Sequence, residues 1–305
     1  MNGIIEEVNG NILKLEGNTG RVLHGRGKVF SGYEDITVEY FSGLVLIIMF
    51  KERSESWRLE FSRLLGLTPC SSMIDKVLFQ ARYEKESPVF DVAGNRAAVD
   101  KTIKENDLNY QLSLGGRQNY GFFTDIVAGR TWVREHSSDR RVLNLFSYTC
   151  SFSVAAIAGD ANHVVNVDMS SAALSVGRAN HKLNNYPSEK VSFQKLNILK
   201  SWSRIGRSGP YDLVIVDPPS FQKGSFSADR DYQKIVNRLA LMTTDGADIL
   251  FCLNDPLITV SAFRELLESE HFKYISRIKN ASVMKEADGE VGLKVLHYQK
   301  TRKLI

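Results

Sequence analysis

Leu213-Val-Ile-Val-Asp217-Pro218-Pro219-Ser220-Phe221 is the stretch of sequence that says most about the fold of this chain. Its first four residues are apolar and branched, which predicts a strand buried on both faces, as in a parallel sheet covered by helices. Proline donates no backbone hydrogen bond, so the strand must end at Asp217. Because ligands of open α/β sheets bind at the carboxyl ends of strands, Asp217 is expected to border a ligand site.

From residue 111 onward, predicted strands alternate with predicted helices on both sides of this stretch. We expect strands at 141–146, 163–167, 191–196, 212–216 and 248–253, and helices at 151–158, 170–184, just after 197, 229–242 and 260–267. Two more strands, 271–278 and 293–299, have no helical pattern between them and should pair as an antiparallel hairpin. The fold class is therefore α/β, a doubly wound, mostly parallel Rossmann-like sheet with an antiparallel last strand.

The first third of the chain has mostly short strand patterns and few helical ones. It predicts a small, β-rich α+β domain at 1–105, followed by the main domain at 106–305. Short strands are expected at 12–15, 21–24, 36–40, 44–51 and 76–83, with a helix at 52–65. Phe41-Ser-Gly, between two of these strands, is typical of a hairpin turn. This domain offers no obvious catalytic motif.

Composition and charge limit the classes of function. The chain of 305 residues is 43% hydrophobic and 24% charged, as in ordinary globular proteins. Residues 111–305 carry 25 basic and 19 acidic side chains, a mild bias toward polyanionic partners such as RNA. Cys70, Cys150 and Cys252 form no C-x-x-C pair, so neither a metal site nor a disulfide framework is expected. Free thiols, and no apolar run near the ~20 residues of a membrane span, predict a cytoplasmic protein without a membrane partner.

Polar residues follow four successive predicted strands. They are Asn144 with the turn behind it, Asp168-Met169-Ser170, Asn197-Ile198 and Asp217. A carboxylate at the end of the second strand can accept hydrogen bonds from both ribose hydroxyls, and Ser170 can cap the next helix. An Asn amide can pair with an adenine edge. Each residue alone is more simply a cap or a turn residue, but their order on one sheet edge indicates a nucleoside site.

The turn after the first strand narrows the choice of cofactor. A dinucleotide site needs G-x-G-x-x-G and a P-loop needs Gly-Lys-Ser/Thr, because backbone must approach phosphates closely. This chain has Ser147-Tyr148-Thr149-Cys150-Ser151, with no glycine before Gly159. S-adenosylmethionine contains a nucleoside, a sulfonium and an amino acid but no phosphate, so it is the expected cofactor.

Four motifs together resemble one bacterial family. Phe146-Ser-Tyr-Thr149, Val167-Asp168-Met-Ser170, Val216-Asp217-Pro-Pro-Ser-Phe221 and Gln118-Asn-Tyr-Gly121-Phe-Phe-Thr-Asp125 are similar to those of the class I S-adenosylmethionine-dependent methyltransferases that include the 23S ribosomal RNA cytosine-C5 and guanine-N7 enzymes. The resemblance covers roughly residues 105–300. Residues 1–105 resemble the family's small preceding domain only loosely.

The resemblance implies roles for named residues. Asp168 would hold the ribose, Asn197 would face the adenine, and Asn144, Phe146, Ser147 and Tyr148 would line the methionine and ribose. Thr149, Met169, Ser170 and Ile198 would complete the cofactor site, and Gln118–Asp125, with Tyr120 and Phe123, would close over its methionine end. Asp217, Pro218, Pro219 and Phe221 would border both the methyl group and the target base, as the catalytic residues.

The chain departs from the family pattern at two places. Cys150-Ser151 replaces the usual pair of small residues, which could narrow the turn and weaken cofactor binding. Cytosine-C5 methylation needs a cysteine nucleophile, but Asn254 occupies the matching position here. Cys252 lies within the apolar run 249–253, where an inert core thiol is the simpler interpretation. We therefore expect transfer to a nitrogen without a covalent intermediate.

Contacts with RNA are expected from residues beside the catalytic stretch, namely Lys223, Arg230, Tyr232 and Asn254. The basic, glycine-rich His24-Gly-Arg26-Gly-Lys28 is a second possible phosphate contact. Two other functions stay open on the sequence alone: a methyltransferase acting on a protein or small molecule, and a cofactor-binding protein with little activity. The oligomeric state is not indicated.

Overall fold

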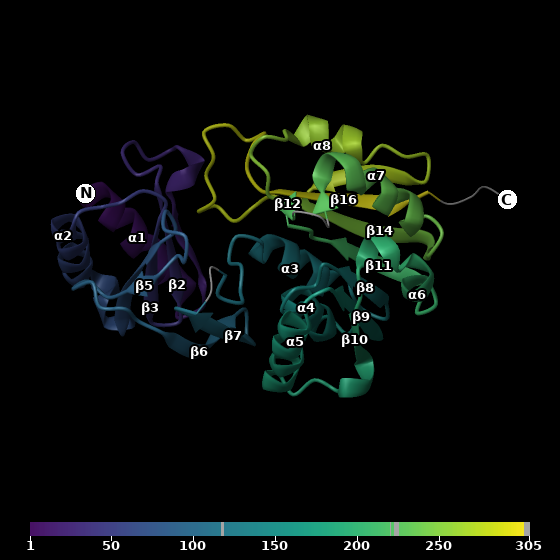
Figure 1. The fold of residues 1–305 in the computed structure, drawn as a ribbon, viewed down its shortest axis with the longest axis horizontal. Helices are drawn as coiled ribbons and strands as arrows, with labels where there is room; N and C mark the ends of the chain where they lie inside the picture. Colours follow the sequence, from purple (N-terminus) through teal and green to yellow (C-terminus); the bar gives the residue numbers. More distant parts are fainter. Residues whose placement is uncertain (117–118, 220, 223–225, 302–305) are drawn as a thin grey trace. The chain divides into compact units, whose positions relative to one another are not determined.

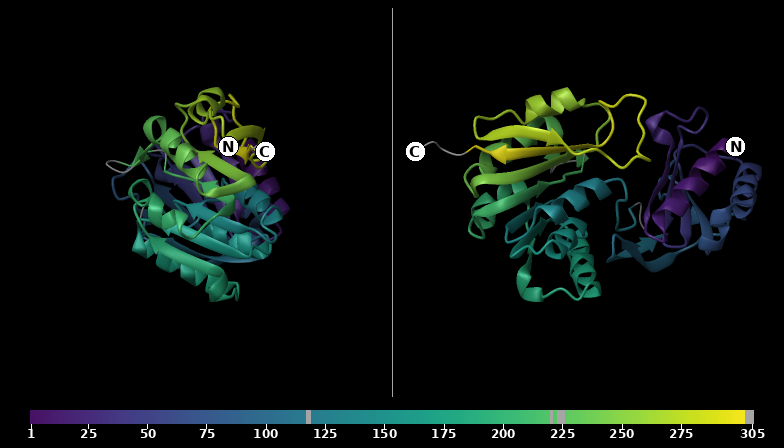
Figure 2. Two further views of the ribbon diagram at one scale, coloured as in Figure 1. Left: turned by 90° about the vertical axis from the view of Figure 1, so that its right-hand side faces the viewer. Right: turned by 180° about the vertical axis from the view of Figure 1, so that it is seen from behind.

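The computed structural model describes residues 1–116, 119–219, 221–222 (backbone only) and 226–301. It divides into two compact units, which Figures 1 and 2 show from three directions. The first unit comprises Met1–Asp125 together with Ala281–Gly289, and the second comprises Ile126–Asn280 together with the chain from Glu290 onward. Each unit has its own core and is described separately.

The second unit is built on a seven-stranded sheet with the order β10-β9-β8-β11-β14-β16-β15. Its strands are β8 (Arg141–Leu145), β9 (His163–Asp168), β10 (Val191–Lys195), β11 (Tyr211–Val216), β14 (Thr243–Leu253), β15 (Phe272–Arg277) and β16 (Lys294–Lys300). The first five are parallel, whereas β16 runs antiparallel to both β14 and β15. The predicted fold class is thus confirmed, with the reversed strand inserted between β14 and the edge strand β15.

Helices cover both faces of this sheet (Figure 1). They are α3 (Val127–Glu135), α4 (Ser151–Ala158), α5 (Ser171–Leu183), α6 (Trp202–Gly206), α7 (Ala228–Leu239) and α8 (Val260–Leu266), with short 3-10 turns η3 (Ser188–Lys190) and η4 (Ile198–Lys200). Strand side chains alternate between two cores: Leu143 and Leu145 pack with residues of α6, α7 and α8, and Val142 packs with residues of α3 and α4. Leu213–Val216 of β11 have no exposed surface, as expected for a strand covered on both sides.

The first unit contains a five-stranded sheet of order β1-β2-β3-β4-β5, covered by α1 and α2. Its elements are α1 (Asn2–Leu15), β1 (Gly20–His24), η1 (Gly25–Gly27), β2 (Ile36–Phe41), β3 (Leu44–Met49), α2 (Glu55–Gly66), η2 (Pro69–Met73), β4 (Lys76–Ala81), β5 (Val89–Phe90), β6 (Val99–Glu105) and β7 (Leu108–Leu114). The strand predicted at 12–15 was wrong. Ile4, Val8 and Ile12 recur every four residues and are all buried, which is the spacing of one helix face.

The boundary between the units differs from the expected division after residue 105. β6 and β7 form an antiparallel hairpin through the Glu105–Leu108 pair, so the division would fall at the hairpin turn. β6 is tied to the first unit, because the Lys101 ammonium donates to the Ser42 carbonyl and the Thr19 amide donates to the Lys104 carbonyl at 2.6 Å. The hairpin therefore belongs entirely to the first unit. None of the helices in the described ranges is long and apolar enough to cross a membrane.

Candidate cofactor and substrate site

The carboxyl ends of three neighbouring parallel strands meet at one edge of the second unit's sheet. Leu145 of β8 is in register with Val167 of β9 on one side and with Val216 of β11 on the other. The turn after β8 therefore lies between Asp168 and Asp217, the residues that end β9 and follow β11. This is the edge at which open α/β sheets bind ligands, and the sequence placed its predicted site residues here.

The turn after β8 has an unusual backbone. Phe146, Tyr148 and Cys150 all have positive φ, at 57°, 45° and 63°. A non-glycine residue in this region costs about 1–2 kcal/mol, and such strain concentrates at functional sites. The Ser147 amide donates to the Val167 carbonyl at 3.1 Å, and the Cys150 amide donates to the Ser147 carbonyl at 2.7 Å. These bonds hold a tight turn against β9 without glycine.

Asp168 joins this turn to the start of α5. Its carboxylate accepts from the Tyr148 amide at 2.9 Å and from the Ser170 amide at 2.8 Å. Each carboxylate oxygen has more than one acceptor site, so both can also accept from a ligand hydroxyl. Ser170 caps α5 by accepting from the Ala173 amide at 3.1 Å, which confirms the predicted helix start. Met169, between them, is 44% exposed.

Asn197 follows β10 at the same edge, since the Leu196 amide donates to the Asp168 carbonyl at 3.0 Å. Asn197 stands at the N-cap of η4, but its side chain makes no capping hydrogen bond. The side-chain amide of Asn197 therefore does not cap the helix that follows it, which is the simplest role for an Asn at this position. Ile198 is buried in the core, so only its backbone is placed to contact a ligand.

The remaining residues predicted around the turn lie deeper. Asn144 is buried and its amide donates to Asn166 Oδ1 at 2.9 Å. Thr149 is buried, and its carbonyl accepts from Asn180 at 2.9 Å. Ser147 Oγ is buried, and among the described residues its neighbour is the weakly hydrogen-bonding Cys150 thiol. A buried hydroxyl without a strong partner is costly, so this hydroxyl suits a polar group of a ligand bound at the turn.

Cys150 does not narrow the turn in the way its position suggested. Its Sγ lies toward Gly177 of α5, where an added Cβ would come within 2.4 Å of it. Burial, together with the nearby Asp168 carboxylate, raises the pKa of the Cys150 thiol to about 12. Cys150 is therefore an uncharged packing residue between α4 and α5.

On the other side of the turn lie the residues that follow β11. Asp217 is half-buried, Pro218 is buried and Pro219 is exposed. The chain then forms a two-stranded ladder, in which β12 (Phe221–Gln222) pairs with β13 (Phe226–Ser227). The side chain of Phe221 and the whole of Lys223 lie outside the described residues, so their predicted roles stay predictions.

Cys252 and Tyr232 are both core residues. Cys252 has no exposed surface and packs among residues of α3 and α4, and burial raises the pKa of its thiol well above the usual value. The predicted RNA contact at Tyr232 is not compatible with its position. Tyr232 is fully buried between α7, α8 and the sheet, and its hydroxyl donates to the Cys252 carbonyl. Its basic and aromatic neighbours in the sequence suggested an exposed loop, whereas Tyr232 lies on the buried face of helix α7.

The other two predicted RNA contacts are at the surface. Arg230 has a side chain that is 58% exposed and forms an ion pair of 2.7 Å with the buried Asp231. Asn254 is exposed and directly follows β14. Because Val216 pairs with Phe251, Asn254 lies at the sheet edge close to the Asp217 segment.

Tyr120 and Phe123 belong to the first unit. Tyr120 is buried against Phe41, with ring centroids 5.3 Å apart, whereas Phe123 is 41% exposed. Gln118, at the start of their segment, lies outside the described residues. Their closure over the methionine end of the cofactor stays a prediction.

A chain of buried polar groups lies beneath the turn and was not predicted from the sequence. Asn166 on β9 donates to Ser153 on α4 at 2.9 Å, and Ser153 Oγ is 2.9 Å from His181 Nε2 on α5. Burial lowers the pKa of His181 to about 4, so the ring is neutral. One signal was present: Asn144 and Asn166 each interrupt an otherwise apolar strand at the same register position.

The fold and the site together define a nucleoside-binding α/β protein. The chain belongs to the S-adenosylmethionine-dependent methyltransferase family, whose model matches residues 20–299. This membership confirms the predicted cofactor.

Individual relatives agree with this assignment. The chain is 28% identical over 244 residues to ribosomal RNA large subunit methyltransferase I of Enterobacter sp. (strain 638), which covers 77% of this chain and 61% of that protein. It is 26% identical to YwbD, a candidate ribosomal RNA large subunit methyltransferase of Bacillus subtilis, over 82% of this chain and 64% of that protein. The chain thus spans about three fifths of the length of these curated relatives. The solved structure of SMU.776, a candidate methyltransferase complexed with SAH, has the same fold, with a TM-score of 0.83, 21% identity and coverage of 98% and 81%.

Proposed function

We propose that this chain transfers a methyl group from S-adenosylmethionine to a base nitrogen of RNA, with ribosomal RNA as the substrate. The observation that carries the proposal is the position of the strained turn Phe146–Cys150 between two carboxylates, Asp168 and Asp217. One carboxylate suits a ribose and the other suits a reacting base. Relatives described as ribosomal RNA methyltransferases support the choice of RNA, and such an enzyme would work in the cytoplasm.

The cofactor side of this proposal uses residues of three strand ends. Asp168 would accept from the two ribose hydroxyls while it keeps its bonds to the Tyr148 and Ser170 amides. Ser147 would give its buried hydroxyl to the amino-acid part of the cofactor, and the Asn197 amide would pair with the adenine. Around them lie further residues that would supply backbone and apolar contact: Phe146, Thr149, Met169 and Ile198. S-adenosylmethionine itself supplies the electrophilic methyl group on its sulfonium.

The substrate side uses the segment after β11. The two prolines fix the direction in which the chain leaves the sheet, so the Pro218 carbonyl and the Asp217 carboxylate are held rather than mobile. The Asp217 carboxylate can accept a proton from an exocyclic amine, and the Pro218 carbonyl can accept a hydrogen bond from the same amine, whereas a ring nitrogen with a free lone pair needs no proton removed. Most of the rate would come from holding the nitrogen in line with the methyl group. Phe221 is proposed to stack on the target base.

The choice of nitrogen rests on Cys252. A cysteine nucleophile must be accessible and able to ionise. Cys252 has no exposed surface, and both burial and the Asp217 carboxylate raise the pKa of its thiol. Direct displacement without a covalent intermediate is the mechanism that these residues support.

A transfer assay with the purified protein tests the proposal. With methyl-labelled S-adenosylmethionine, we expect label in ribosomal RNA and none in the protein fraction of the same ribosomes. RNA binding should weaken steeply with salt, with a log–log slope of about −2 or steeper for three or more phosphate contacts. Label in protein alone, together with weak salt dependence, would favour the protein-methyltransferase alternative. Cofactor binding without transfer to any acceptor would favour a binding protein.

A further inference from the structure

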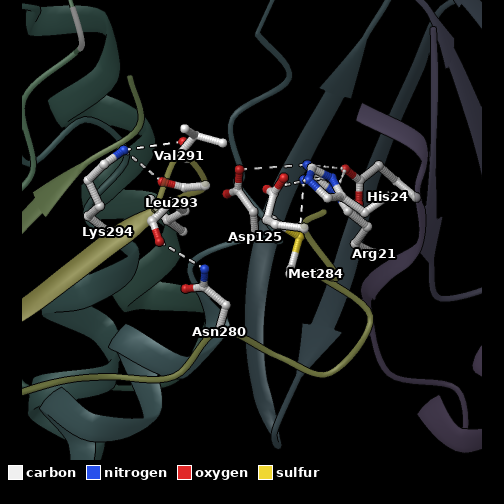
Figure 3. Close-up of polar contacts among 11 residues, drawn as sticks. Arg21, His24, Asp125, Asn280, Met284, Val291, Leu293 and Lys294 are labelled. Carbon is white, nitrogen blue, oxygen red and sulfur yellow. Dashed lines mark hydrogen bonds and ion pairs between the residues drawn. The ribbon is translucent and has the colours of Figure 1, made fainter. Parts of the chain in front are cut away.

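Lys294 is a lysine with no exposed surface at the start of β16. Its ammonium donates to the backbone carbonyls of Asp255 at 2.7 Å and Gly292 at 2.8 Å. It also donates to the Val291 carbonyl at 3.3 Å (Figure 3). Lysine is almost never fully buried without partners. A set of converging carbonyls around a buried ammonium is therefore a built feature of the fold.

The position of Lys294 connects this feature to the substrate edge of the sheet. Lys294 pairs with Leu253, the last residue of β14, so its ammonium reaches the loop that follows. We call residues 254–259 the target loop. It carries Asn254, the residue at the position where related C5 enzymes have their nucleophile, and Leu257, which is 90% exposed.

Within the target loop, Asp255 is the central residue. Its carboxylate accepts from the Leu257 amide at 2.9 Å, and its carbonyl accepts from the Ile258 amide at 3.4 Å as well as from Lys294. Holding this one carbonyl therefore orders the turn on which Asn254 and Leu257 stand.

The far end of the target loop is held by the segment Glu290–Lys294, which also contains Lys294. Glu290 accepts from the Val260 amide through its carbonyl at 3.1 Å, and from the Ser261 amide and hydroxyl through its carboxylate at 3.3 Å. Upstream, the Asn280 amide donates to the Leu293 carbonyl at 2.8 Å (Figure 3). Glu290–Lys294 thus fixes both ends of the target loop.

We infer that Lys294 is a positioning residue for RNA, which sets the target loop so that Asn254 and Leu257 can contact the nucleotide being methylated. The inference rests on the proposed function. An exposed leucine beside a polar side chain suits a base that has been lifted from its stack, since the leucine offers apolar contact to the ring. The buried ammonium acts through the loop and does not itself touch substrate.

The same strand provides a matched control. Lys300, at the other end of β16, donates to the Ala240 carbonyl at 2.9 Å and to the Thr243 carbonyl at 2.6 Å, with 15% of its side chain exposed. Lys300 has the same chemistry as Lys294, on the same strand, but is remote from the target loop. Lys294→Met and Lys300→Met therefore each remove an ammonium from backbone carbonyls, and only the first touches the substrate edge.

The experiment compares both variants with the wild type. For Lys294→Met we expect the KM for ribosomal RNA to rise about tenfold, since small misplacements of substrate are costly. The Kd for S-adenosylmethionine, measured by calorimetry, should stay within twofold of the wild type. Hydrogen exchange at the Leu257 and Ile258 amides should accelerate about tenfold. Lys300→Met should leave the RNA KM and both amides unchanged.

Several results would overturn the inference. One is an unchanged RNA KM in Lys294→Met, and another is an equal rise in both lysine variants. If Lys294→Met does not fold, Glu290→Ala takes its place. This substitution is at an exposed side chain and removes the carboxylate that ties the Glu290–Lys294 segment to Ser261. A wild-type RNA KM and wild-type loop exchange in that variant would likewise reject the inference. Failure of the proposed function is distinct, because then the wild type itself would not methylate RNA, while hydrogen exchange would still report whether Lys294 orders the loop.

Discussion

Asp168 has a structural role in the fold and a proposed role in binding the cofactor. It satisfies two backbone amides, of Tyr148 and Ser170, at a place where a strained turn meets a helix start. The charge of its carboxylate is retained for a ligand, because each oxygen accepts more than one hydrogen bond. If Asp168 has both roles, the turn can bind a nucleoside cofactor without the glycines that phosphate-binding loops need.

Replacing this carboxylate should remove most of the cofactor affinity. Two charge-assisted hydrogen bonds to a ribose are worth about 3 kcal/mol or more together, and each 1.4 kcal/mol is tenfold in Kd. Asp168→Ala is therefore expected to raise the Kd for S-adenosylmethionine at least about 10²-fold by calorimetry. Asp245→Ala, at a side chain that is 54% exposed, serves as the control and should bind normally. Equal affinities of the Asp168 variant and the wild type would remove Asp168 from the site.

Cys252 is the residue that separates the two possible chemistries. Because it is a buried, un-ionised thiol, Cys252→Ala is expected to keep kcat within a fewfold of the wild type. Loss of the sulfur leaves a small cavity, so the free energy of unfolding should fall by about 1 kcal/mol. The checks are a methyl-transfer assay and thermal unfolding. A Cys252→Ala protein that binds cofactor normally but transfers nothing would show that the thiol is a nucleophile after all.

At the scale of elements, one cysteine and one glycine pack against each other where α4 begins beside α5. Cys150, in the left-handed conformation, fills the space that Gly177 leaves open on α5. Gly177→Ala would place a Cβ 2.4 Å from Cys150 Sγ and 3.0 Å from its Cβ. We expect this to destabilise the protein by about 1–3 kcal/mol, as in other overpacked cores.

The Cys150→Gly background should reverse this effect. Glycine removes both the clash and the strain of a positive φ, and alanine is a better helix former than glycine by about 0.8–1.0 kcal/mol. Gly177→Ala is therefore expected to be neutral or stabilising in that background. Chemical denaturation of the four proteins in this cycle measures the coupling. Equal destabilisation in both backgrounds would contradict the assigned contact.

The polar chain that joins β8, β9, α4 and α5 predicts a pH dependence of stability. The pKa of His181 is lowered from 6.5 to about 4 in the folded protein, because the ring is buried. Below pH 6.5 the unfolded chain binds a proton at this residue and the folded chain does not. Stability should therefore be complete above pH 6.5 and fall as the pH drops to 4, by about 3 kcal/mol.

Denaturation curves between pH 7 and 4 test this pH dependence. In the His181→Gln variant, the free energy of unfolding should fall much less between pH 7 and 4. In the His271→Gln variant, which changes a half-exposed ring, it should fall as in the wild type. The same slope in the wild type and the His181 variant would contradict the assignment of the decline to this ring.

The elements that the sequence predicted well are those with a strong local signal. The helix at Ser151–Ala158 was predicted at its observed limits, since Gly159 marks its end, and the strand ending at Val216 was predicted to end there because two prolines follow Asp217. α1 was missed because its last residues, 12–15, were assigned to a short strand, so the apolar residues at every fourth position were not recognised as one helix face. Tyr232 was misassigned because the same mixture of basic and aromatic residues occurs both in surface loops and on half-buried helices.

At the scale of the whole molecule, the chain passes between its two units three times, at 125–126, 280–281 and 289–290. The excursion Ala281–Gly289 is held within the first unit. Glu286 lies 2.9 Å from His24 Nε2, the Ala287 amide donates to the Gly27 carbonyl at 2.7 Å, and Arg21 contacts Met284 (Figure 3). None of these contacts is visible in the sequence, since the partners are some 260 positions apart.

This excursion also changes the interpretation of the basic, glycine-rich motif at residues 24–28. A Cβ on Gly27 would lie 1.9 Å from the Lys285 carbonyl, and one on Gly25 would lie 1.9 Å from the Tyr33 carbonyl. The glycines are thus required by the close approach of backbone, and a phosphate is not needed to explain them. Long-range packing of this kind is the part of the fold and site that sequence patterns do not carry.

The grouping of the candidate cofactor residues at one sheet edge, by contrast, was largely predictable, because they follow consecutive strands and the topology brings them together; their contact with the cofactor stays a prediction. What the sequence left open is the acceptor, since acceptor choice depends on surfaces rather than on strand ends. We expect the acceptor to be RNA and the methylated atom to be a nitrogen.

Mass spectrometry of digested ribosomal RNA, from cells with and without the gene, tests this central claim most directly. The account predicts that one N-methylated nucleoside disappears when the gene is deleted. It should return with the wild-type gene and stay absent with the Asp168→Ala variant. Ribosomal RNA with identical methylated nucleosides in both strains, in cells where the protein is made and binds S-adenosylmethionine, would contradict the account.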